Sequence, residues 1–225
     1  PQQDMDQALL PSADLSNMNT TRVGWFWEYT FNVVKYCNTV ISRIDDIEWK
    51  NPEDRNHILG SAFFHRAYRY YRAVHQFGNV PFLDGELTEP KTDFYSSDRW
   101  SILERLYSDM EFAYKWVRAD AERGKVNKDA CGVLLMKICM SLGKFDRAIE
   151  IGNEIVANHP LMTERFTSNK NKSRTNLMHD LHSVEAKLDM SNTEGIFYTS
   201  SYPDIVGSTR IYTMRCGVPS WNTGG

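Results

Sequence analysis

Apolar side chains recur every three or four residues from about residue 23 to Pro160, which is the period of α-helices that bury one face. The first stripe consists of Phe26, Tyr29, Val33, Cys37, Val40 and Ile44. The second consists of Phe63, Ala67, Tyr70, Val74 and Phe77. Asn51-Pro52 before the second stripe is typical of a helix start, and Gly78-Asn79 after it is typical of a helix end. We therefore expect two long consecutive helices, the second with Arg66, Arg69 and Arg72 on its other faces.

Three more helices are expected after an irregular loop at residues 79–97. Ser101 and Glu104 have the spacing of a capping box. The stripe that follows consists of Leu103, Leu106, Met110, Ala113 and Val117. Asn127 is a suitable cap for a helix at about residues 128–142, and a tight turn at Gly143-Lys144 separates that helix from a last one.

The last helix pair has the spacing of a tetratricopeptide repeat. In that repeat a turn glycine is followed at fixed offsets by an aromatic residue, by a small alanine where the helices cross closely, and by a closing proline. Gly143, Phe145, Ala148 and Pro160 occupy those offsets. Because helix pairs of similar length precede this one, the sequence predicts a mostly α, tetratricopeptide-like helical repeat array with irregular loops.

The same pattern divides the chain into three regions. Residues 1–22 are a polar, irregular lead-in, residues 23–160 are the helical-repeat region, and residues 161–225 begin an irregular covering lobe. Within this lobe, residues 195–202 are aromatic and β-branched, which predicts a short strand. The chain starts at Pro1 and stops at Gly225 without a recognisable opening or closing element, so we expect a piece of a longer protein with a truncated lobe.

Composition and charge argue against several classes of protein. With 26 Lys and Arg against 29 Asp and Glu, the net charge is −3, which argues against a nucleic-acid binder held by a net basic field. No apolar run approaches the ~20 residues of a membrane-spanning helix. None of the four cysteines forms a CxxC pair. Cys131 and Cys139 share a helical face beside Leu135, so we expect buried free thiols and no zinc site.

The sequence lacks the common signatures of catalysis and of cofactor binding. It contains no Walker A motif, no GxGxxG, no GxSxG and no HExxH. His179 and His182 are three residues apart and could bind a metal ion from one helical face, but no third ligand is identifiable. We therefore expect no catalytic residues, no cofactor and no bound metal. A metal-dependent hydrolase that uses the two histidines is kept as a further hypothesis.

Two tryptophans at the start of the first helix are the best candidates for ligand binding. Trp25 and Trp27 follow a polar lead-in that contains Asn19 and Arg22. Flat aromatic rings bind the C–H faces of sugars, while amide and guanidinium groups bind hydroxyls. Residues two apart do not share a helical face, and Phe26 between them starts the core stripe. We therefore expect one tryptophan to be buried and the other to be partly exposed.

Several motifs, in this order along the chain, resemble the SusD/RagB family. The clearest is Arg66-Ala67 with Tyr70-Tyr71 followed by Phe77-Gly78-Asn79-Val80-Pro81, similar to the family's RAxxY stretch and its aromatic-Gly-x-Val-Pro turn. Further family positions are matched by Asn38 with Val40-Ile41, by Arg99, Ser101, Glu104, Asp109 and Ala113, by Gly124, Lys128 and Ala130, by residues 143–148, and by Glu194-Gly195-Ile196-Phe197. The resemblance covers roughly residues 23–202, with departures at Ser61 and Lys125.

The resemblance implies a non-catalytic, glycan-binding lipoprotein for nutrient uptake, on the outer leaflet of a Gram-negative outer membrane and facing the exterior. Such proteins serve starch or polysaccharide utilisation, and they pass oligosaccharides to a SusC-like TonB-dependent transporter. The implied membrane contact is a lipid anchor that these residues do not contain. The family places its sugar site in loops that include the stretch before the first long helix. By position, the implied ligand-binding residues are Asn19, Arg22, Trp25 and Trp27.

A second class of function remains open from the residues alone. A helical repeat array can also be an adaptor that binds a protein or peptide partner in a concave groove, and this function needs no sugar site. Neither hypothesis involves nucleic acid.

Overall fold

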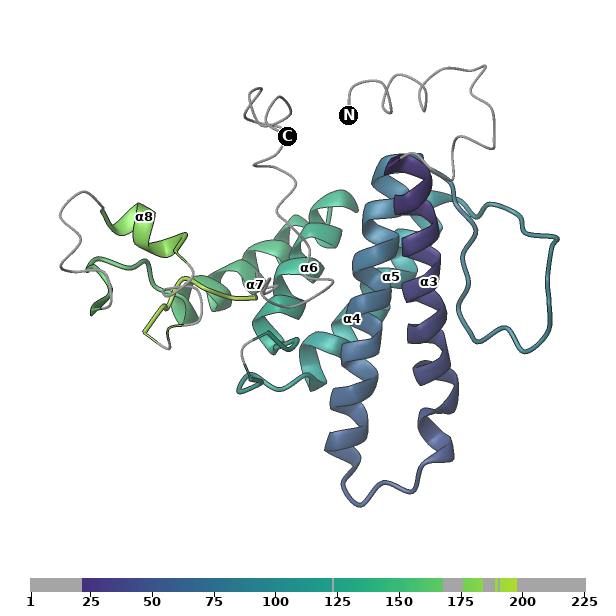
Figure 1. Ribbon diagram of the computed structural model, residues 1–225, viewed down its shortest axis with the longest axis horizontal. Coiled ribbons are helices and arrows are strands. Elements are labelled where there is room, and N and C mark those ends of the chain that lie inside the picture. Colours follow the sequence, from purple (N-terminus) through teal and green to yellow (C-terminus); the bar gives the residue numbers. More distant parts are fainter. Residues whose placement is uncertain (1–21, 123, 168–175, 184–188, 190, 198–225) are drawn as a thin grey trace, which may run out of the picture.

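The computed structural model describes residues 22–122, 124–167, 176–183, 189 and 191–197, in which helices follow one another along the chain (Figure 1). They are α3 (Arg22–Arg43), the 3-10 helix η1 (Ile44–Asp46), α4 (Pro52–Phe77), α5 (Arg99–Trp116), α6 (Lys128–Ser141), α7 (Phe145–Asn158) and α8 (Leu177–Leu181). From α3 to α7, each helix packs against the next one in the chain, as in a repeat array. The predicted fold class, mostly α and tetratricopeptide-like, is confirmed.

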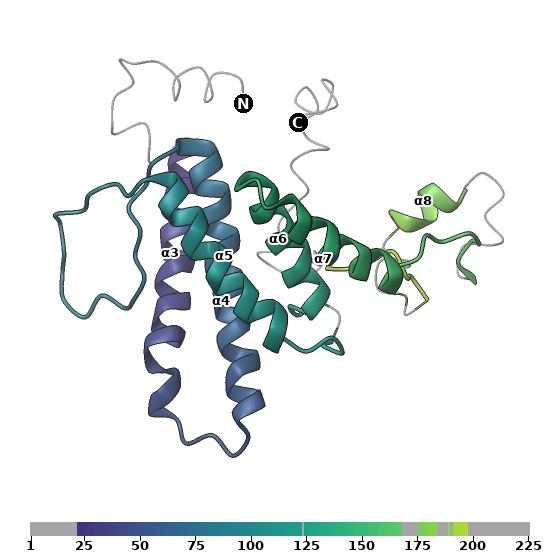
Figure 2. The same ribbon diagram turned by 180° about the vertical axis from the view of Figure 1, so that it is seen from behind.

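Helices α3 and α4 form a long antiparallel hairpin beside the shorter helices (Figures 1 and 2). Asn51 caps α4 by accepting a hydrogen bond from the backbone N–H of Glu53, and Pro52 occupies the first helical position. At the other end Gly78 adopts a φ of +77°, a conformation that strains residues with a Cβ, and its N–H donates to the Val74 carbonyl. The predicted start and end of this helix are confirmed.

The buried face of α3 differs from the predicted stripe. Thr30, Val34 and Asn38 are buried, whereas Tyr29 and Val40 of the predicted stripe are exposed. The prediction was wrong at these positions because it followed apolar residues only. The helix instead buries two polar side chains and leaves aromatic ones outside.

Asp98, and not Ser101, caps α5. Its carboxylate accepts hydrogen bonds from the backbone N–H groups of Trp100 and Ser101, and the helix begins at Arg99. The capping box predicted at Ser101 and Glu104 was therefore wrong, because it placed the helix start one turn too late. The predicted stripe of α5 is confirmed, since all five of its residues are buried.

Helices α6 and α7 form the predicted repeat-like pair. Asn127 caps α6 by accepting from the Ala130 N–H, and Gly143 makes the turn with a φ of +73°. Ala148 is buried at the crossing of the helices, as the repeat pattern predicts. Cys131 and Cys139 are buried free thiols, which confirms the prediction for both.

Several predictions fall partly or wholly outside the described residues. The predicted strand at 195–202 is described only as far as Phe197, and residues 195–197 belong to no strand. Within the described ranges, strand-like pairing is limited to an isolated bridge between Val80 and Ser97. Most of the lead-in and of the covering lobe are also outside, so the division at 1–22, 23–160 and 161–225 stays a prediction. No described helix combines the length and hydropathy needed to cross a bilayer.

Candidate functional site

Trp25 and Trp27 both lie near the start of α3 with part of each ring in solvent. Their exposed fractions are 57% and 38%, so the prediction that one of them is buried was wrong. Trp27 packs against Phe31 and Phe77, with ring centroids 4.8 and 5.1 Å away, but these neighbours leave part of the ring uncovered. Trp25 stacks on Tyr29 with the centroids 5.1 Å apart and the planes 8° from parallel.

The other two predicted site residues are placed less completely. Asn19 lies outside the described residues, and Arg22 is described only as the first residue of α3. Trp25 and Trp27 lie two residues apart on α3 and have different ring neighbours, so a common site that combines them with Asn19 and Arg22 stays a prediction.

Aromatic rings and guanidinium groups alternate along one surface of α3 and α4. We call this surface the aromatic–arginine row, and it consists of Trp25, Tyr29, Arg69, Tyr68 and Arg72. The Arg69 guanidinium lies 4.4 Å from the Tyr29 ring centroid and 5.6 Å from that of Tyr68. The Arg72 guanidinium lies 5.7 Å from the Tyr68 centroid. Each exposed contact of this kind contributes about 0.5–1 kcal/mol, so the row holds its rings and charges in defined positions.

The positive charges of this row have no acidic partner in the part of the chain that the structure describes. Arg69 and Arg72 lie over aromatic rings, and no described carboxylate lies within 4.0 Å of either guanidinium. Desolvation of the ring and, as a second cause, the charge of Arg69 lower the pKa of His65. The row is therefore a locally positive aromatic surface on a chain whose net charge is −3.

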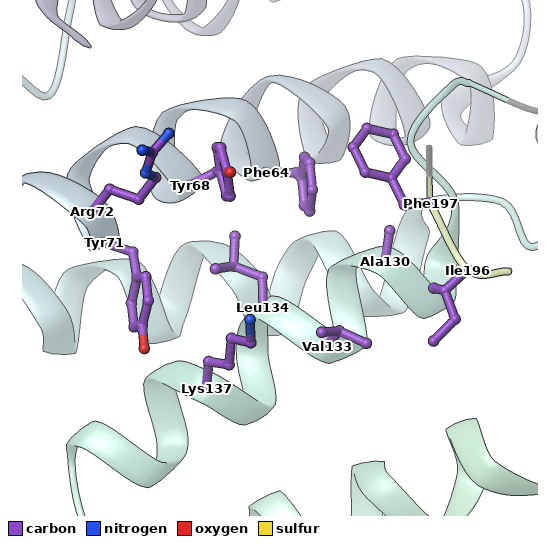
Figure 3. Close-up of a pocket in the computed structure, with 10 residues that line it drawn as sticks. All are labelled: Phe64, Tyr68, Tyr71, Arg72, Ala130, Val133, Leu134, Lys137, Ile196 and Phe197. Atoms are coloured by element: carbon purple, nitrogen blue, oxygen red, sulfur yellow. The ribbon is translucent and has the colours of Figure 1, made fainter. Parts of the chain in front are cut away.

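A pocket of about 430 Å³ lies where this row meets α6. Figure 3 shows side chains of α4 on one side and of α6 on the other, with Phe197 at one end. The lining comprises Phe64, Tyr68, Tyr71, Arg72, Ala130, Val133, Leu134, Lys137, Ile196 and Phe197. Tyr68 and Arg72 belong both to the pocket and to the row, so the two features form one continuous surface.

The end wall of the pocket is fixed by hydrogen bonds and ring packing. The Asn127 side-chain amide donates to the Ile196 carbonyl at 2.7 Å, and the Glu194 carboxylate accepts from the Met162 N–H at 2.7 Å. The Phe197 ring packs edge-on against Phe64, with centroids 5.7 Å apart. Since Asn127 also caps α6, one side chain ties this wall to the repeat pair.

This surface was not predicted from the sequence, although a local signal was present. Residues 66–72 contain three arginines and three tyrosines, and such a mixture on one helix can produce ring–guanidinium contacts with the neighbouring helix. The placement of the arginines away from the core is correct for Arg72, which is exposed, and for Arg69, which is half-buried. It is wrong for Arg66, whose side chain is fully buried.

Arg66 is part of a structural network and does not reach the surface. It donates to Asp109 at 2.5 Å, to the Asn38 side chain at 3.0 Å and to the Asp84 carbonyl at 2.8 Å. Burial of the charge is tolerable because Asp109 neutralises it and these groups bind both terminal nitrogens, although Nε has no hydrogen-bond partner among the described residues. The sequence alone does not show that these groups converge.

The described residues contain no cluster suited to a metal ion. No group of three or more His, Cys, Asp or Glu side chains in this part of the chain is arranged to hold one. His179 is 3.9 Å from Asp180, and that carboxylate accepts from Arg165 at 2.8 Å. The hydrolase hypothesis therefore has no geometric support from these histidines.

Comparisons with known proteins agree with this architecture. A SusD-like family described as "Starch-binding associating with outer membrane" matches residues 5–139. SusD-like protein P2 of Formosa agariphila is 25% identical over 142 residues, which are 60% of this chain and 27% of that protein. A SusD-like protein from Bacteroides fragilis shares the fold with a TM-score of 0.57 at 21% identity, covering 65% of this chain and 31% of the other. A laminarin-binding SusD-like protein shares the fold with a TM-score of 0.55 at 18% identity, and the match covers 62% of this chain and 31% of that protein.

The chain spans about 31% of these structures and 27% of the curated relative, so it corresponds to one part of such a protein. The family consists of non-catalytic, carbohydrate-binding proteins, and its description associates it with the outer membrane. The family match covers more than half of the chain and agrees with the resemblance seen in the sequence. The chain therefore belongs to the SusD-like family.

Proposed function

We propose that this chain is the helical part of a non-catalytic glycan-binding protein on the outer leaflet of a Gram-negative outer membrane. The protein faces the exterior, is held by a lipid anchor, and delivers oligosaccharides to a SusC-like TonB-dependent transporter. Membership of the SusD-like family supports this proposal, and one observation of the structure carries it. Trp25 is more than half exposed and is held in a fixed orientation by its stack on Tyr29.

The geometry around Trp25 suits a sugar ring. One face of its indole is occupied by Tyr29, and the exposed remainder can receive the C–H face of a sugar. Arg22 precedes Trp25 by three residues in α3, a spacing that puts two residues on the same side of a helix. We therefore assign the ligand site to Asn19, Arg22, Trp25 and Trp27, with Trp25 as its principal ring.

The first test is a glycan array followed by titration of each hit against the full 225-residue chain, with tryptophan fluorescence as the signal. We expect saturable binding without any product. Trp25→Ala should weaken binding by about tenfold while leaving the unfolding midpoint unchanged, because loss of one well-placed stacking contact corresponds to ~1.4 kcal/mol.

Trp27→Ala and Trp100→Ala serve as comparison variants in the same titration. Trp27 supports Phe31 and Phe77, so its removal should lower both affinity and stability. Trp100 is 48% exposed on α5 and contacts Arg99, so it is a matched exposed tryptophan outside the proposed site. Unchanged affinity in both Trp25→Ala and Trp27→Ala would refute the site assignment.

Delivery to a transporter needs a separate experiment. The lipid-anchored, full-length protein should co-purify from outer membranes with a TonB-dependent transporter, and deletion of that transporter should abolish uptake of the bound glycan. If the protein binds glycan but does not co-purify with a transporter, the result would support the proposed binding function and contradict the proposed delivery.

The adaptor hypothesis has one observation in its favour. Phe145, Ile149 and Val156 form an exposed apolar stripe on α7, a face typical of contact with another helix. A soluble protein partner recovered in a pull-down, together with a silent glycan array, would favour this function. Ile149→Lys should then abolish the pull-down.

A further inference from the structure

We infer that the aromatic–arginine row and the pocket at its end form a second carbohydrate site, selective for acidic oligosaccharides that carry uronate or sulfate-ester groups. The inference rests on the proposed glycan-binding function and adds to it both a location and a charge class. The site shares only Trp25 with the four residues assigned above, because its charged part is built on α4 and α6 around Tyr68, Tyr71, Arg72 and Lys137.

The charges of this surface favour an anion. Arg69 and Arg72 on α4 and Lys137 on α6 have no carboxylate within 4.0 Å among the described residues, and no acidic residue lines the pocket. Figure 3 shows Arg72 of α4 and Lys137 of α6 at the end of the pocket opposite Phe197, with the Lys137 ammonium directed towards α4 and the Arg72 guanidinium turned away from α6. A carboxylate or sulfate at that end can therefore bind Lys137 in the pocket, while Arg72 supplies positive charge at the rim, where the pocket meets the row. A guanidinium or ammonium group next to an anion gives hydrogen bonds about twice as strong as neutral ones.

The rings of this surface favour a sugar over other anions. Tyr68 and Tyr71 flank Arg72 in the pocket, and Tyr29 and Trp25 continue the row beyond it. Alternation of rings and cations matches an acidic glycan, in which apolar C–H faces and negative groups repeat together along one chain. The pocket volume of about 430 Å³ lies within the range of small-molecule sites, and the open row can accept the units that follow.

The site is also organised before any ligand arrives. Cation–π contacts hold Arg69 and Arg72 between rings, and the Asn127–Ile196 hydrogen bond fixes the end wall. A site whose groups are already ordered loses less conformational entropy on binding. The selectivity for charge therefore follows from fixed cations and does not require a rearrangement of α4 or α6.

The test uses acidic oligosaccharides and their neutralised counterparts as probes for the full 225-residue chain. The acidic probes are tetramers of galacturonate, mannuronate and chondroitin sulfate. The neutral counterparts of the first two are their methyl esters. The neutral counterpart of the third is chondroitin that has been both desulfated and methyl-esterified. We expect at least one acidic member to bind ten times or more tightly than its neutral counterpart. Raising NaCl from 50 to 500 mM should weaken the acidic member only, because salt screens charge–charge attraction.

Three variants locate the site. Arg72→Gln and Lys137→Gln should each weaken the preferred acidic tetramer by about tenfold and leave neutral ligands unaffected, as loss of a charge-assisted contact predicts. Lys91→Gln, which removes an exposed charge on the distant 79–97 loop, should leave both affinities unchanged. Circular dichroism confirms that each variant is folded.

The outcomes separate this inference from the proposed function. Neutral glycans that bind through Trp25, without any preference for acidic tetramers, would overturn the inference and retain the proposed function. Acidic tetramers that bind equally well to Arg72→Gln and Lys137→Gln would also overturn it, because the charge recognition would lie elsewhere. Silence towards every acidic and neutral probe would overturn both.

Discussion

The α3–α4–α5 layer and the α6–α7 pair reach similar helix packing with different interiors. The first encloses an ion pair between Arg66 and Asp109 together with the polar side chain of Asn38. The second is closed by small and apolar residues, among them Gly132, Cys131 and Ala148. A repeat array can therefore change the chemistry of its core from one helix pair to the next while keeping the same architecture.

The polar interior of the first layer is explained by the loop that it holds. The Asn38 amide donates to the carbonyls of Leu83 and Gly85 at 2.8 and 3.0 Å, and Arg66 donates to the Asp84 carbonyl between them. Residues 79–97 form an irregular loop that projects from the hairpin (Figures 1 and 2), so few of its backbone groups can pair with one another. The α6–α7 pair is joined by a tight turn and has no such loop to anchor.

Removal of the acid from the first layer should have the largest effect on stability. Asp109→Asn leaves the fully buried Arg66 without its counter-charge, and loss of one partner from a buried pair costs about 3–5 kcal/mol. We expect the urea midpoint of the full chain, followed by tryptophan fluorescence, to fall accordingly.

A double variant keeps this prediction testable if the single one does not fold. Arg66→Met with Asp109→Leu removes both charges and should regain at least half of the lost stability, because an apolar pair of similar volume is often neutral. A loss below about 1 kcal/mol in Asp109→Asn would contradict the role given to the pair.

Two glycines of the repeat pair should respond in opposite directions to alanine. A Cβ on Gly132 would lie 2.8 Å from a Tyr114 ring carbon and 3.0 Å from Ile155 Cδ1, so Gly132→Ala should cost about 1–3 kcal/mol through overpacking. A Cβ on Gly152 meets the flexible Met136 sulfur at 3.4 Å, so Gly152→Ala should stabilise by about 0.5–1 kcal/mol through helix propensity. Urea unfolding of the two variants measures both signs, and equal effects would contradict close packing at Gly132.

Most features that depend on neighbours in the sequence were predicted well, with the start of α5 as the exception. The caps at Asn51 and Asn127 and the turns at Gly78 and Gly143 each involve atoms a few residues away. Hydrophobic period, cap and turn chemistry together were therefore enough for the order and bounds of these helices, and for the family resemblance.

Features that depend on contacts between distant segments were missed. Arg66 is buried because Asn38, Asp84 and Asp109 converge on it, and these residues lie on a helix, a loop and another helix. The burial of Trp25 and Trp27 was predicted from the apolar stripe of α3, but the buried face of that helix depends on its contact with α4. The α4–α6 pocket is lined by two helices and by residues 196–197, so the only local signal for it was the group of arginines and tyrosines in α4.

The N-cap of α5 makes a smaller contribution to stability, and two substitutions show whether Asp98 or Ser101 is the cap. Asp98→Ala should lower the free energy of unfolding by about 1 kcal/mol, since the N–H groups of Trp100 and Ser101 lose their acceptor. Ser101→Ala should change it by less than about 0.5 kcal/mol, as expected at the surface of a helix. Urea unfolding of both variants measures the two changes in free energy. A larger loss of stability in Ser101→Ala than in Asp98→Ala would support the capping box predicted from the sequence.

The smallest effect concerns the ion pair that links the two regions. Arg147 of α7 donates two hydrogen bonds of 2.8 Å to Glu111 of α5, and this contact lowers the pKa of the Glu111 carboxyl. A lowered folded-state pKa stabilises the fold above the unfolded value of about 4.3, and the contribution is lost as pH falls through the folded value. Glu111→Gln should therefore destabilise by only about 0.5–1 kcal/mol at pH 7, because both side chains are partly exposed, and should match the parent protein near pH 2.

Glu104→Gln is the matched control, since Glu104 of α5 pairs through one contact of 3.0 Å with Lys144, the residue that precedes α7. Its side chain is more exposed than that of Glu111, so the loss at pH 7 should be smaller. The measurement is the difference in unfolding free energy between variant and parent from pH 7 down to pH 2. If the difference in unfolding free energy between Glu111→Gln and the parent protein is the same at pH 2 as at pH 7, the substitution acts through packing. The contact between α5 and α7 would then be stabilised by side-chain packing and not by the ion pair.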